Sequence, residues 1–451
     1  MPRVALHTLG CKVNQYETQR IAEDFRSRGF DLVDFSDEAD VYVINTCTVT
    51  QTADSKSRQA ARAAVNRNPN AKVVLTGCYA ETSTEQLRRI DGVSMVLGNR
   101  DKSRLVEHVV GELSFAERVI SDQSPVISDR CGYLSRTRAL LKIQDGCDQF
   151  CAYCAVPLAR PEMVSRPFVE VLSEAEELAR RGYKEIVLTG IRLGLYDFGL
   201  VELIRSIVEL PGIERVRLSS IELTDIPTGL PELMADNRKL CRHLHVPLQS
   251  GDDEILARMK RPYTSSQFES FVRDARSLVP EIAITTDIMV GFPGETEEQF
   301  EHTYGFSRRV NFARTHVFPY SPRIGTAAWE MADDIPPAEK SRRKARMIEL
   351  AAECSDEFAA QMIGTTVGIL VEGGKPGRDG GPEVKRGAVE SAQSVPVLSA
   401  WNSPRLFSAC GLTDNYVRVA FRGGPAHVGE IVDVTVESVA RGMAHGHLVS
   451  V

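Results

Sequence analysis

The residues best suited to chemistry are three cysteines in the sequence Cys147-Asp-Gln-Phe-Cys151-Ala-Tyr-Cys154, which we call the loop cysteines. Cysteine thiolates are the usual ligands of iron–sulfur clusters, which commonly take four of them. Three thiolates in one tight loop can hold three corners of a [4Fe-4S] cluster and leave the fourth iron open. An open iron can chelate the amine and carboxylate of S-adenosylmethionine (SAM), and an electron from the cluster can then split its sulfonium.

A structural zinc loop is the alternative interpretation of this motif. Zinc prefers four closed ligands, commonly from two C-x2-C pairs or from Cys and His pairs. No second pair lies near residues 147–154 in the sequence. The C-x3-C-x2-C spacing therefore favours the iron–sulfur cluster.

Three more cysteines, which we call the strand-end cysteines, each follow a predicted strand: Cys11 in TLGCKVN, Cys47 in NTCTVT and Cys78 in LTGCYA. The carboxyl ends of parallel strands face one crevice in which ligands bind, so these distant residues can converge. Each also precedes a predicted helix, whose N-terminal dipole favours a thiolate. The placement favours a second metal site. The alternative is that the three are buried as small hydrophobic side chains, as free cysteines often are.

A strand-then-helix rhythm predicts the domain that carries the strand-end cysteines. Strands joined by single helices imply a parallel sheet with right-handed crossovers. We therefore predict an N-terminal α/β domain with a parallel sheet over residues 1–125. Its strand and helix patterns alternate over residues 4–10, 14–29, 41–44, 51–66 and 72–77.

The rhythm restarts at residue 138 and continues for about six units. A complete eight-unit barrel needs about 250 residues, and residues 138–319 are fewer. We predict a partial (β/α)6 barrel within a domain of residues 130–363. Its predicted strands cover residues 140–143, 185–189, 215–219, 243–248, 284–290 and 315–319. Its predicted helices include residues 169–181, 200–210 and 296–310, the last with a capping-box pattern of Thr296 and Gln299.

The carboxyl ends of these predicted strands carry residues that suit a cofactor. Gly190, Glu222, Gln249 and Gly291 each stand in the loop after one strand, and in a barrel this face carries the active site. Each loop alone is weak evidence, because Gly, Pro and Ser are also ordinary turn residues. Their recurrence on one face predicts that these four residues, with Tyr153 of the cysteine loop, contact the cofactor.

A different texture follows a long charged helix over residues 338–362. Residues 364–451 are rich in Gly and Val and alternate as strands do at 416–421 and 431–436. This pattern predicts a third domain, a small antiparallel β-barrel. The Gly/Pro/Ser-rich residues 373–403 are predicted to form a mobile insertion.

Composition excludes several classes of protein. The chain has 451 residues, 43% of them hydrophobic and 25% charged, which rules out a mainly disordered, collagen-like or coiled-coil protein. Its net charge of −7 excludes coating of nucleic acid by bulk charge. No apolar run approaches the length of about 18 residues that a membrane helix needs, and no signal peptide is evident. We expect a cytoplasmic protein whose cysteines stay reduced.

These features together resemble the radical-SAM methylthiotransferases over essentially the whole chain. The stretches TLGCKVNQYET, NTCTVTQTADSKSRQ, NPNAKVVLTGC and HVFPYSPRIGT are similar to the branch that modifies N6-threonylcarbamoyladenosine next to the tRNA anticodon. The resemblance implies that the C-terminal barrel is a TRAM domain, similar to OB-type RNA modules. Pro161 departs from the glycine that the family usually has after the cluster loop, and proline fixes φ and removes a donor.

By this resemblance, the loop cysteines hold the [4Fe-4S] cluster that cleaves SAM, and the strand-end cysteines hold an auxiliary [4Fe-4S] cluster that delivers sulfur. In the family, one SAM yields a deoxyadenosyl radical that removes hydrogen from adenine C2, and another SAM donates the methyl group of the 2-methylthio product. The implied partners are tRNA, an electron donor such as flavodoxin or ferredoxin, and a sulfur donor. We expect a monomer without a membrane partner.

Other functions stay open at this point. The same chemistry acts on isopentenyladenosine in tRNA or on a ribosomal-protein aspartate in other branches, and TLGCKVNQYET argues against the aspartate branch. A non-catalytic iron–sulfur protein that binds RNA is an alternative of another class. Such a protein would keep its clusters without consuming SAM.

Overall fold

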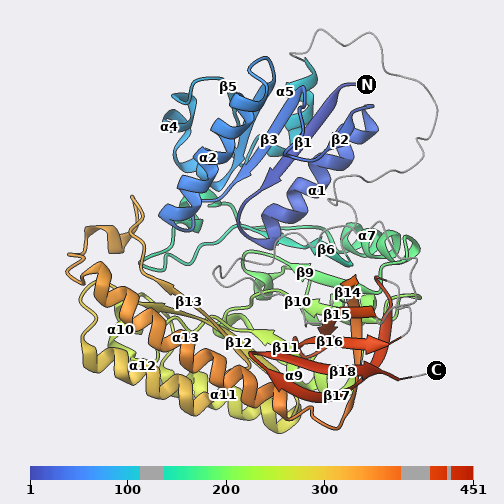
Figure 1. The fold of residues 1–451 in the computed structure, drawn as a ribbon. Coiled ribbons are helices and arrows are strands. Elements are labelled where there is room, and N and C mark those ends of the chain that lie inside the picture. Colours follow the sequence, from blue (N-terminus) through green and yellow to red (C-terminus); the bar gives the residue numbers. More distant parts are fainter. Residues whose placement is uncertain (112–136, 377–406, 424–427, 450–451) are drawn as a thin grey trace. The chain divides into compact units, whose positions relative to one another are not determined.

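A five-stranded, all-parallel sheet forms in the N-terminal part of the computed structural model, which describes residues 1–111, 137–376, 407–423 and 428–449 (Figure 1). The strand order is β2-β1-β3-β4-β5. The prediction of a parallel sheet is confirmed, but it missed β2 and β5, which have only three and four residues. The elements are β1 (Arg3–Thr8), α1 (Lys12–Ser27), β2 (Asp31–Val33), β3 (Val41–Thr46), α2 (Gln51–Arg67), β4 (Lys72–Gly77), α3 (Cys78–Thr82), α4 (Thr84–Arg88), β5 (Val93–Val96), η1 (Lys102–Arg104) and α5 (Leu105–Gly111).

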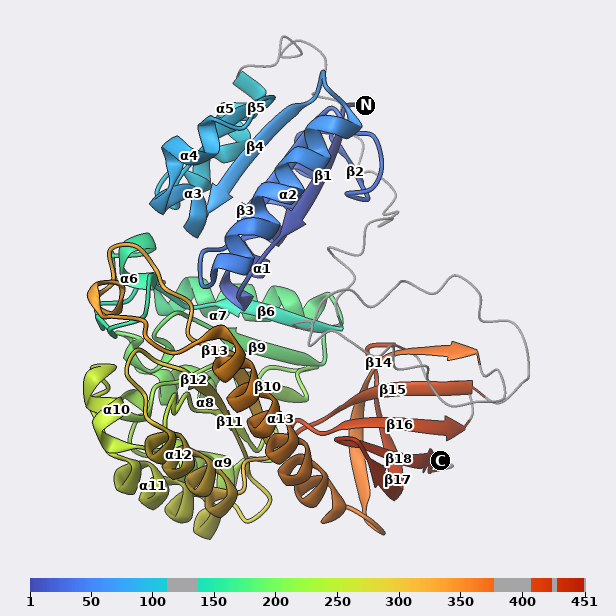
Figure 2. The same ribbon diagram turned by 60° about the vertical axis from the view of Figure 1, so that its left-hand side comes forward.

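Helices cover both faces of this sheet (Figure 2). Phe25 of α1 and Val106 of α5 pack in one apolar cluster with Val43 of β3. Ala61 of α2 packs on the opposite face with Tyr42. In a doubly wound sheet with this strand order, ligands bind outside the carboxyl ends of β1 and β3, where the winding direction reverses.

Six further parallel strands form the predicted partial barrel. They are arranged as two sheets of three, β10-β9-β6 and β11-β12-β13, which the isolated bridges Val216↔Leu240 and Ser220↔His245 connect. The strand β11 ends at His245 instead of continuing to residue 248, because Pro247 has no N–H for a ladder bond. The strands are β6 (Arg138–Lys142), β9 (Glu185–Thr189), β10 (Arg215–Leu218), β11 (His243–His245), β12 (Ala283–Val290) and β13 (Arg314–Pro319).

Helices and short turns connect the strands of the partial barrel. The capping box predicted for Thr296 and Gln299 is confirmed: each side chain bonds the backbone N–H of the other. The connecting elements are β7 (Gln144–Asp145), α6 (Val156–Ala159), β8 (Val164–Ser165), α7 (Phe168–Arg180), η2 (Leu193–Leu195), α8 (Leu200–Val208), η3 (Leu223–Asp225), α9 (Leu230–Asp236), α10 (Asp253–Arg258), α11 (Ser265–Leu278), α12 (Glu297–Val310), η4 (Ala327–Glu330) and α13 (Pro337–Ala360). None of the described helices is both long and apolar enough to span a membrane.

The two faces of the partial barrel differ in polarity. Ile284 and Ile288 of β12 lie in the hydrophobic core with Phe300 of α12. Thr285, which alternates with them along the strand, instead bonds the ring of His245 at 3.0 Å. Alternation along a strand places successive side chains on opposite faces, so Thr285 and His245 lie on the inner face, away from this core.

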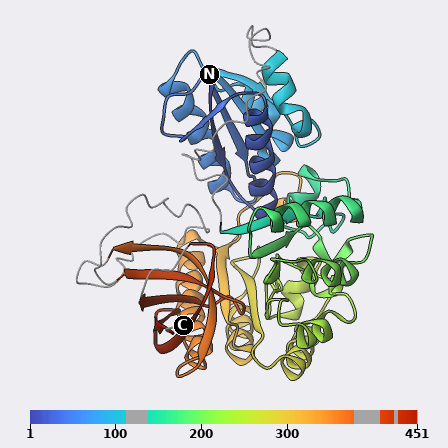
Figure 3. The ribbon, with the colours of Figure 1, turned by 90° about the vertical axis from the view of Figure 1, so that its right-hand side faces the viewer.

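The C-terminal strands close into a five-stranded barrel in the order β14-β15-β16-β18-β17 (Figure 3). The predicted small antiparallel barrel is confirmed, with one exception in its pairing: β16 and β18 run parallel. Of the predicted insertion at residues 373–403, β14 includes the first four residues and residues 377–403 lie outside the described part of the chain. The strands are β14 (Thr366–Pro376), β15 (Phe407–Thr413), β16 (Arg418–Gly423), β17 (Ile431–Ala440) and β18 (Met443–Leu448).

The turn between β15 and β16 contacts the partial barrel through buried polar groups. Arg217 is fully buried, pairs with Glu185 at 2.6 Å, and donates to the carbonyl oxygens of Thr413 and Asp414 at 2.9 Å each. The ring of Tyr416 stacks on the ring of His243, with centroids 4.2 Å apart. This turn therefore packs against the inner-face residues of β9, β10 and β11.

The chain divides into two compact units that do not follow its linear order. The N-terminal unit comprises Met1–Arg136, Asp145–Val164 and Ser321–Glu330, and the barrel unit comprises Thr137–Gln144, Ser165–Tyr320 and Met331–Val451. The loop cysteines therefore group with the N-terminal sheet and its strand-end cysteines. The predicted boundary between residues 125 and 130 lies outside the described residues.

Candidate active site

The loop cysteines are held by backbone hydrogen bonds. The N–H of Cys147 donates to the carbonyl oxygen of Arg160 at 3.0 Å. The sulfur of Cys147 lies 3.4 Å from the backbone nitrogen of Gln149, and the sulfur of Cys154 lies 3.4 Å from that of Val156. Both N–H groups donate to sulfur, which favours the thiolate that binds metal.

The strand-end cysteines stand at the strand ends where the sequence places them, and their meeting around one metal cluster stays a prediction. They follow β1, β3 and β4 at the carboxyl edge of the sheet. A Cβ atom on Gly10, the residue before Cys11, would lie 2.7 Å from the sulfur of Cys47. Burial, together with the nearby sulfurs of Cys78 and Cys11, raises the pKa of Cys47 to about 12. The residue before Cys11 therefore lies against the side chain of Cys47.

Both donor sets consist of cysteine side chains, whose chemistry suits an iron–sulfur cluster. Among the described residues, no three His, Cys, Asp or Glu side chains are gathered tightly enough to coordinate one ion. The ligands of a [4Fe-4S] cluster bind separate irons and stand further apart, and their usual chemistry is cysteine thiolate. Iron would displace the proton that burial keeps on Cys47, because metal ligands must be deprotonated.

Arg160 lies at the centre of a buried polar cluster in the N-terminal unit. Only 4% of this residue is exposed. Its guanidinium donates to both carboxylate oxygens of Glu17 at 2.8 and 2.9 Å and to those of Asp145 at 2.7 Å each. It also donates to Oδ1 of Asn14 at 3.0 Å and, through Nε, to the sulfur of Cys78 at 3.4 Å. Arg160 stands directly before Pro161. Its carbonyl oxygen accepts the N–H of Cys147 and its side chain contacts Cys78, so the proline leaves both contacts in place.

A second buried arginine ties the segment Ser321–Glu330 to the sheet. Arg323 donates to the carbonyl oxygen of Thr48 at 3.1 Å and to the carboxylate of Asp54 at 2.6 Å. The N–H of Ala328, further along the segment, donates to the carbonyl oxygen of Ala152 at 2.7 Å. The segment therefore contacts both the residue after Cys47 and the residue after Cys151.

Sequence reasoning missed Arg160 and Arg323 as site residues. Both stand in stretches that the sequence singled out, Arg160 before the unusual proline and Arg323 within HVFPYSPRIGT. Their proximity to the strand-end cysteines was not visible, because Arg160 is 82 positions from Cys78, and Arg323 is 275 positions from Thr48, the residue after Cys47.

Four of the five residues predicted to contact SAM lie at the carboxyl ends of β9, β10, β11 and β12, as expected. Gln249 has a left-handed backbone with φ of +72°, a strain often found at functional sites. Within the described residues, its buried Oε1 atom has no hydrogen-bond partner, so it suits a ligand. Glu222 pairs with Arg261. Gly190 lies directly after β9.

Gly291 is explained by packing within the protein. Its N–H donates to Glu295 at 2.7 Å, and a Cβ atom would lie 2.5 Å from Cγ of Lys340. Tyr153, the fifth predicted contact, is half-buried between two loop cysteines. That these five residues contact SAM stays a prediction.

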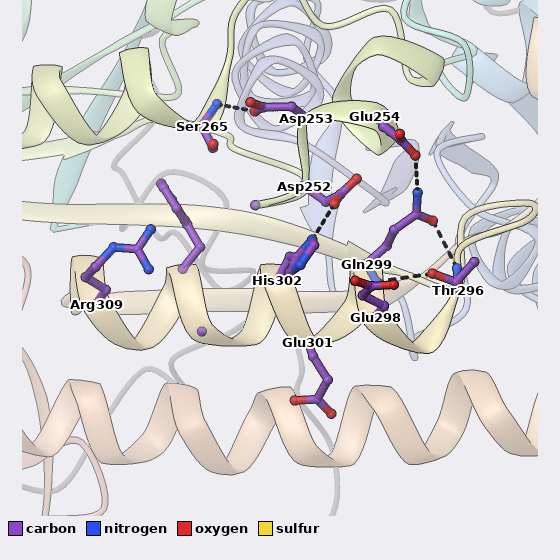
Figure 4. A pocket seen from close by; sticks show the side chains of 13 residues that line it. Asp252, Asp253, Glu254, Ser265, Thr296, Glu298, Gln299, Glu301, His302 and Arg309 are labelled. Atoms are coloured by element: carbon purple, nitrogen blue, oxygen red, sulfur yellow. Dashed lines mark hydrogen bonds and ion pairs between the residues drawn. The ribbon is translucent and has the colours of Figure 1, made fainter.

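A pocket of about 730 Å³ between α10 and α12 is a separate feature (Figure 4). Five of its thirteen lining residues are acidic, so we call it the acidic pocket, and Asp252 accepts a hydrogen bond from His302 at 2.8 Å. This bond raises the pKa of His302. The pocket contains none of the predicted cysteine ligands or SAM contacts.

Family models match all three parts of the chain. The model described as "Uncharacterized protein family UPF0004" matches residues 3–98, the radical SAM superfamily matches residues 141–307, and the TRAM domain matches residues 408–449. Each match lies inside one predicted domain. The three matches agree with the resemblance to the radical-SAM methylthiotransferases in the N-terminal, central and C-terminal parts of the chain.

Curated relatives cover nearly the whole chain. A Bacillus subtilis protein named "Threonylcarbamoyladenosine tRNA methylthiotransferase MtaB" is 38% identical over 97% of this chain and 94% of its own length. A Thermotoga maritima protein of the same name is 38% identical over 82% of this chain and 87% of its own. A Mannheimia succiniciproducens protein named "tRNA-2-methylthio-N(6)-dimethylallyladenosine synthase" is 30% identical over 99% and 92%.

Among solved structures, the radical SAM methyltransferase TsrM from Kitasatospora setae superposes with a TM-score of 0.54. It is 17% identical, and the match covers 70% of this chain and 73% of that one. At this identity the likeness supports the fold alone. The relatives over the full length decide the class: the chain is an enzyme and belongs to the radical-SAM tRNA methylthiotransferase family.

Proposed function

We propose that this enzyme adds a methylthio group to C2 of N6-threonylcarbamoyladenosine next to the anticodon of tRNA. The structural observation that supports it is the grouping of all six predicted cysteine ligands within one compact unit. The substrate follows the names of the Bacillus and Thermotoga relatives, which are more similar to this chain than the Mannheimia relative is.

The loop cysteines would hold the SAM-cleaving [4Fe-4S] cluster, and the strand-end cysteines would hold an auxiliary [4Fe-4S] cluster. When bound, the clusters and SAM supply the electron, the radical that removes the C2 hydrogen, and the sulfur and methyl groups. The protein's own part is to bind and orient. The N–H groups of Gln149 and Val156 support the thiolates of Cys147 and Cys154, and Gln249 offers its Oε1 atom to a ligand.

The same proposal includes the partners and the setting. The TRAM barrel would bind tRNA, and small separate proteins would supply electrons and sulfur, with flavodoxin or ferredoxin as the type of electron donor. The enzyme would act as a monomer in the cytoplasm. Its N-terminal helix α2 carries Lys56, Arg58 and Arg62, and such basic groups suit contacts to RNA phosphates.

Nucleoside mass spectrometry of total tRNA tests the substrate. Cells that lack this protein should lose 2-methylthio-N6-threonylcarbamoyladenosine, and restoring the gene should recover it. A gene with Cys151→Ala should fail to restore it, although the protein still binds tRNA. If the isopentenyl nucleoside or ribosomal protein changes instead, the substrate assignment fails. If nothing changes, the chain is not the catalyst in those cells.

A further inference from the structure

We propose that Arg160 is the positioning residue that joins the two predicted cluster sites and raises the reduction potential of the auxiliary cluster. The inference rests on the proposed function in one respect, that the strand-end cysteines hold an iron–sulfur cluster. It adds a residue that neither the cysteine motifs nor the names of the relatives assign.

One residue contacts a cysteine of each set. The backbone carbonyl of Arg160 accepts the N–H of Cys147 at 3.0 Å, and its side-chain Nε donates to the sulfur of Cys78 at 3.4 Å. Asn99 makes a parallel connection: its Nδ2 donates to the carbonyl oxygen of Ala159 at 2.8 Å and contacts the sulfur of Cys78 at 3.8 Å. Both contacts therefore hold the segment after Cys154 next to Cys78, the last of the strand-end cysteines.

The guanidinium is fixed in this position by two carboxylates. Glu17 of α1 and Asp145 before the loop each bind it with both oxygens, at 2.7–2.9 Å. The ammonium of Lys102 binds Glu17 as well, at 2.5 Å, and is itself 6% exposed. The two positive charges of Arg160 and Lys102 balance the two negative charges of Glu17 and Asp145, so this group of side chains is neutral. Without Arg160 the group carries a net negative charge.

That balance sets the direction of the expected effect. The reduction potential of an iron–sulfur cluster depends on net charge and on hydrogen bonds to its sulfurs. Reduction adds an electron, so a nearby cation and an N–H donor to a ligand sulfur favour the reduced state. Removing Arg160 takes away both and exposes the auxiliary cluster to the charges of Glu17 and Asp145. The potential should then fall.

The test uses the full chain with Cys147, Cys151 and Cys154 all replaced by Ala, so that only the auxiliary cluster can form. After anaerobic loading with iron and sulfide, a redox titration followed by electron paramagnetic resonance gives the ratio of reduced to oxidised cluster. Arg160→Gln should lower that ratio about tenfold at a fixed solution potential, which corresponds to about −59 mV for a one-electron couple. Arg160→Lys keeps the charge but lacks the planar guanidinium that binds both carboxylates and the sulfur of Cys78 together, so its shift should be smaller and of the same sign.

A buried arginine elsewhere provides the matched control. Arg217 also pairs with a buried glutamate and with backbone carbonyls, but its partners Glu185, Thr413 and Asp414 belong to the barrel unit. Arg217→Gln should destabilise the protein and leave the auxiliary potential unchanged. The reference protein, or parent, is the chain with the three loop cysteines replaced by Ala. The proposal is overturned if Arg160→Gln and Arg160→Lys both leave the ratio of reduced to oxidised cluster within about twofold of that of the parent, or if Arg217→Gln shifts the ratio equally. If Arg160→Gln binds no cluster while Arg217→Gln does, the positioning role is supported and Arg160→Lys decides the effect on potential.

Failure of the proposed function gives a different result. If the parent with only strand-end cysteines binds no cluster, the two-cluster assignment itself is wrong and the role of Arg160 falls with it. If the cluster forms and its potential follows Arg160, but tRNA is not modified, the inference about Arg160 stands and the substrate assignment does not.

Discussion

The two cysteine sets lie in the same unit but are built in opposite ways. The loop cysteines are held by contacts within a few residues, such as the N–H of Gln149 on the sulfur of Cys147. The strand-end cysteines follow three strands of a sheet, and their nearest supports, Arg160 and Arg323, come from distant parts of the chain. The loop set depends mainly on its own backbone geometry, with one bond from the distant Ala328 to Ala152, whereas the strand-end set depends on the whole sheet and on the segments that carry Arg160 and Arg323.

The strand-end set depends more than the loop set on the folding of the whole N-terminal domain. A chelating loop closes over few residues at small entropic cost, whereas bringing Cys11, Cys47 and Cys78 together requires the sheet to form first. Damage to the tertiary structure should therefore remove the auxiliary cluster before the SAM-cleaving one.

Single ligand replacements should separate the two sets by function. Cys151→Ala should abolish SAM cleavage, and Cys47→Ala should leave SAM cleavage in place while methylthiolation falls more than about a hundredfold, since even outer-shell changes cost up to that much. Deoxyadenosine and the 2-methylthio nucleoside, measured in one reaction, report the two activities. Cys241→Ala is the control, because burial raises the pKa of Cys241 to about 12 and it lies in the barrel unit. Equal loss of both products in Cys47→Ala would contradict the division.

The contact of Arg323 should matter for the strand-end set in particular. Arg323→Gln leaves the carboxylate of Asp54, paired at 2.6 Å, without its cation, and breaking such a buried pair costs about 3–5 kcal/mol. The unfolding free energy from urea titration, the iron content and SAM cleavage should be measured together. We expect iron to fall while SAM cleavage persists.

Arg100→Gln is the matched control for this change. Its pair with Glu162, at 2.8 Å, is about two-thirds exposed on both sides, so its loss should cost less than about 1 kcal/mol. A similar cost for the two variants would show that Arg323 contributes no more than a surface ion pair does.

Two glycines allow the same comparison at the backbone. Gly77 before Cys78 and Gly146 before Cys147 have φ of +97° and +82°, and a Cβ atom would lie 2.4 Å from the carbonyl oxygen of Thr46 and 1.8 Å from that of Glu162. Alanine at either position should cost about 1–3 kcal/mol. Gly77→Ala should reduce the auxiliary cluster, and Gly146→Ala should reduce SAM cleavage.

Gly182→Ala separates backbone strain from collision. Gly182 has a similar φ of +87°, but nothing lies within 4 Å of the position of its Cβ atom. Its replacement should therefore cost only the strain, at the lower end of that range. Thermal unfolding of the three variants gives the ranking, and an equal loss in all three would contradict the role of the close contacts.

The smallest effect is expected at the acidic pocket, which belongs to neither set. The hydrogen bond to Asp252 raises the pKa of His302. A raised folded-state pKa stabilises the protein fully below the unfolded value of about 6.5, and this stabilisation is lost as pH rises through the folded value. His302→Gln should lower the melting temperature slightly below pH 6.5 and leave it unchanged at pH 9, with no effect on tRNA modification. Loss of modification would give the pocket a functional role.

The sequence alone predicted what local spacing and strand order determine. The loop cysteines follow from the C-x3-C-x2-C spacing, and the position of the strand-end cysteines at the carboxyl edge of the sheet follows from their place after three parallel strands. The capping box at Thr296 was also readable, because its two partners are three positions apart. Short strands such as β2 were missed, since three residues carry too little periodicity.

Long-range partners could not be predicted in the same way. Arg160 contacts Cys78 across 82 positions, and Arg323 contacts Thr48 across 275. Nothing local marks such a pair, because an arginine after a loop is most often a surface residue. The parallel pairing of β16 with β18 was missed for a related reason: alternation shows that a strand exists but not which neighbour it takes.

The turn between β15 and β16 has a consequence for modularity. Matches to separate family models suggest that the chain consists of exchangeable segments. However, Arg217 donates to the carbonyl oxygens of Thr413 and Asp414. The ring of His243 also stacks on the ring of Tyr416. A transplanted TRAM barrel without this turn would leave a guanidinium and an imidazole facing an unfilled space. The C-terminal barrel is thus a separate module in the sequence and a fixed component of the fold, and an exchange between relatives must carry the turn and its receiving residues together.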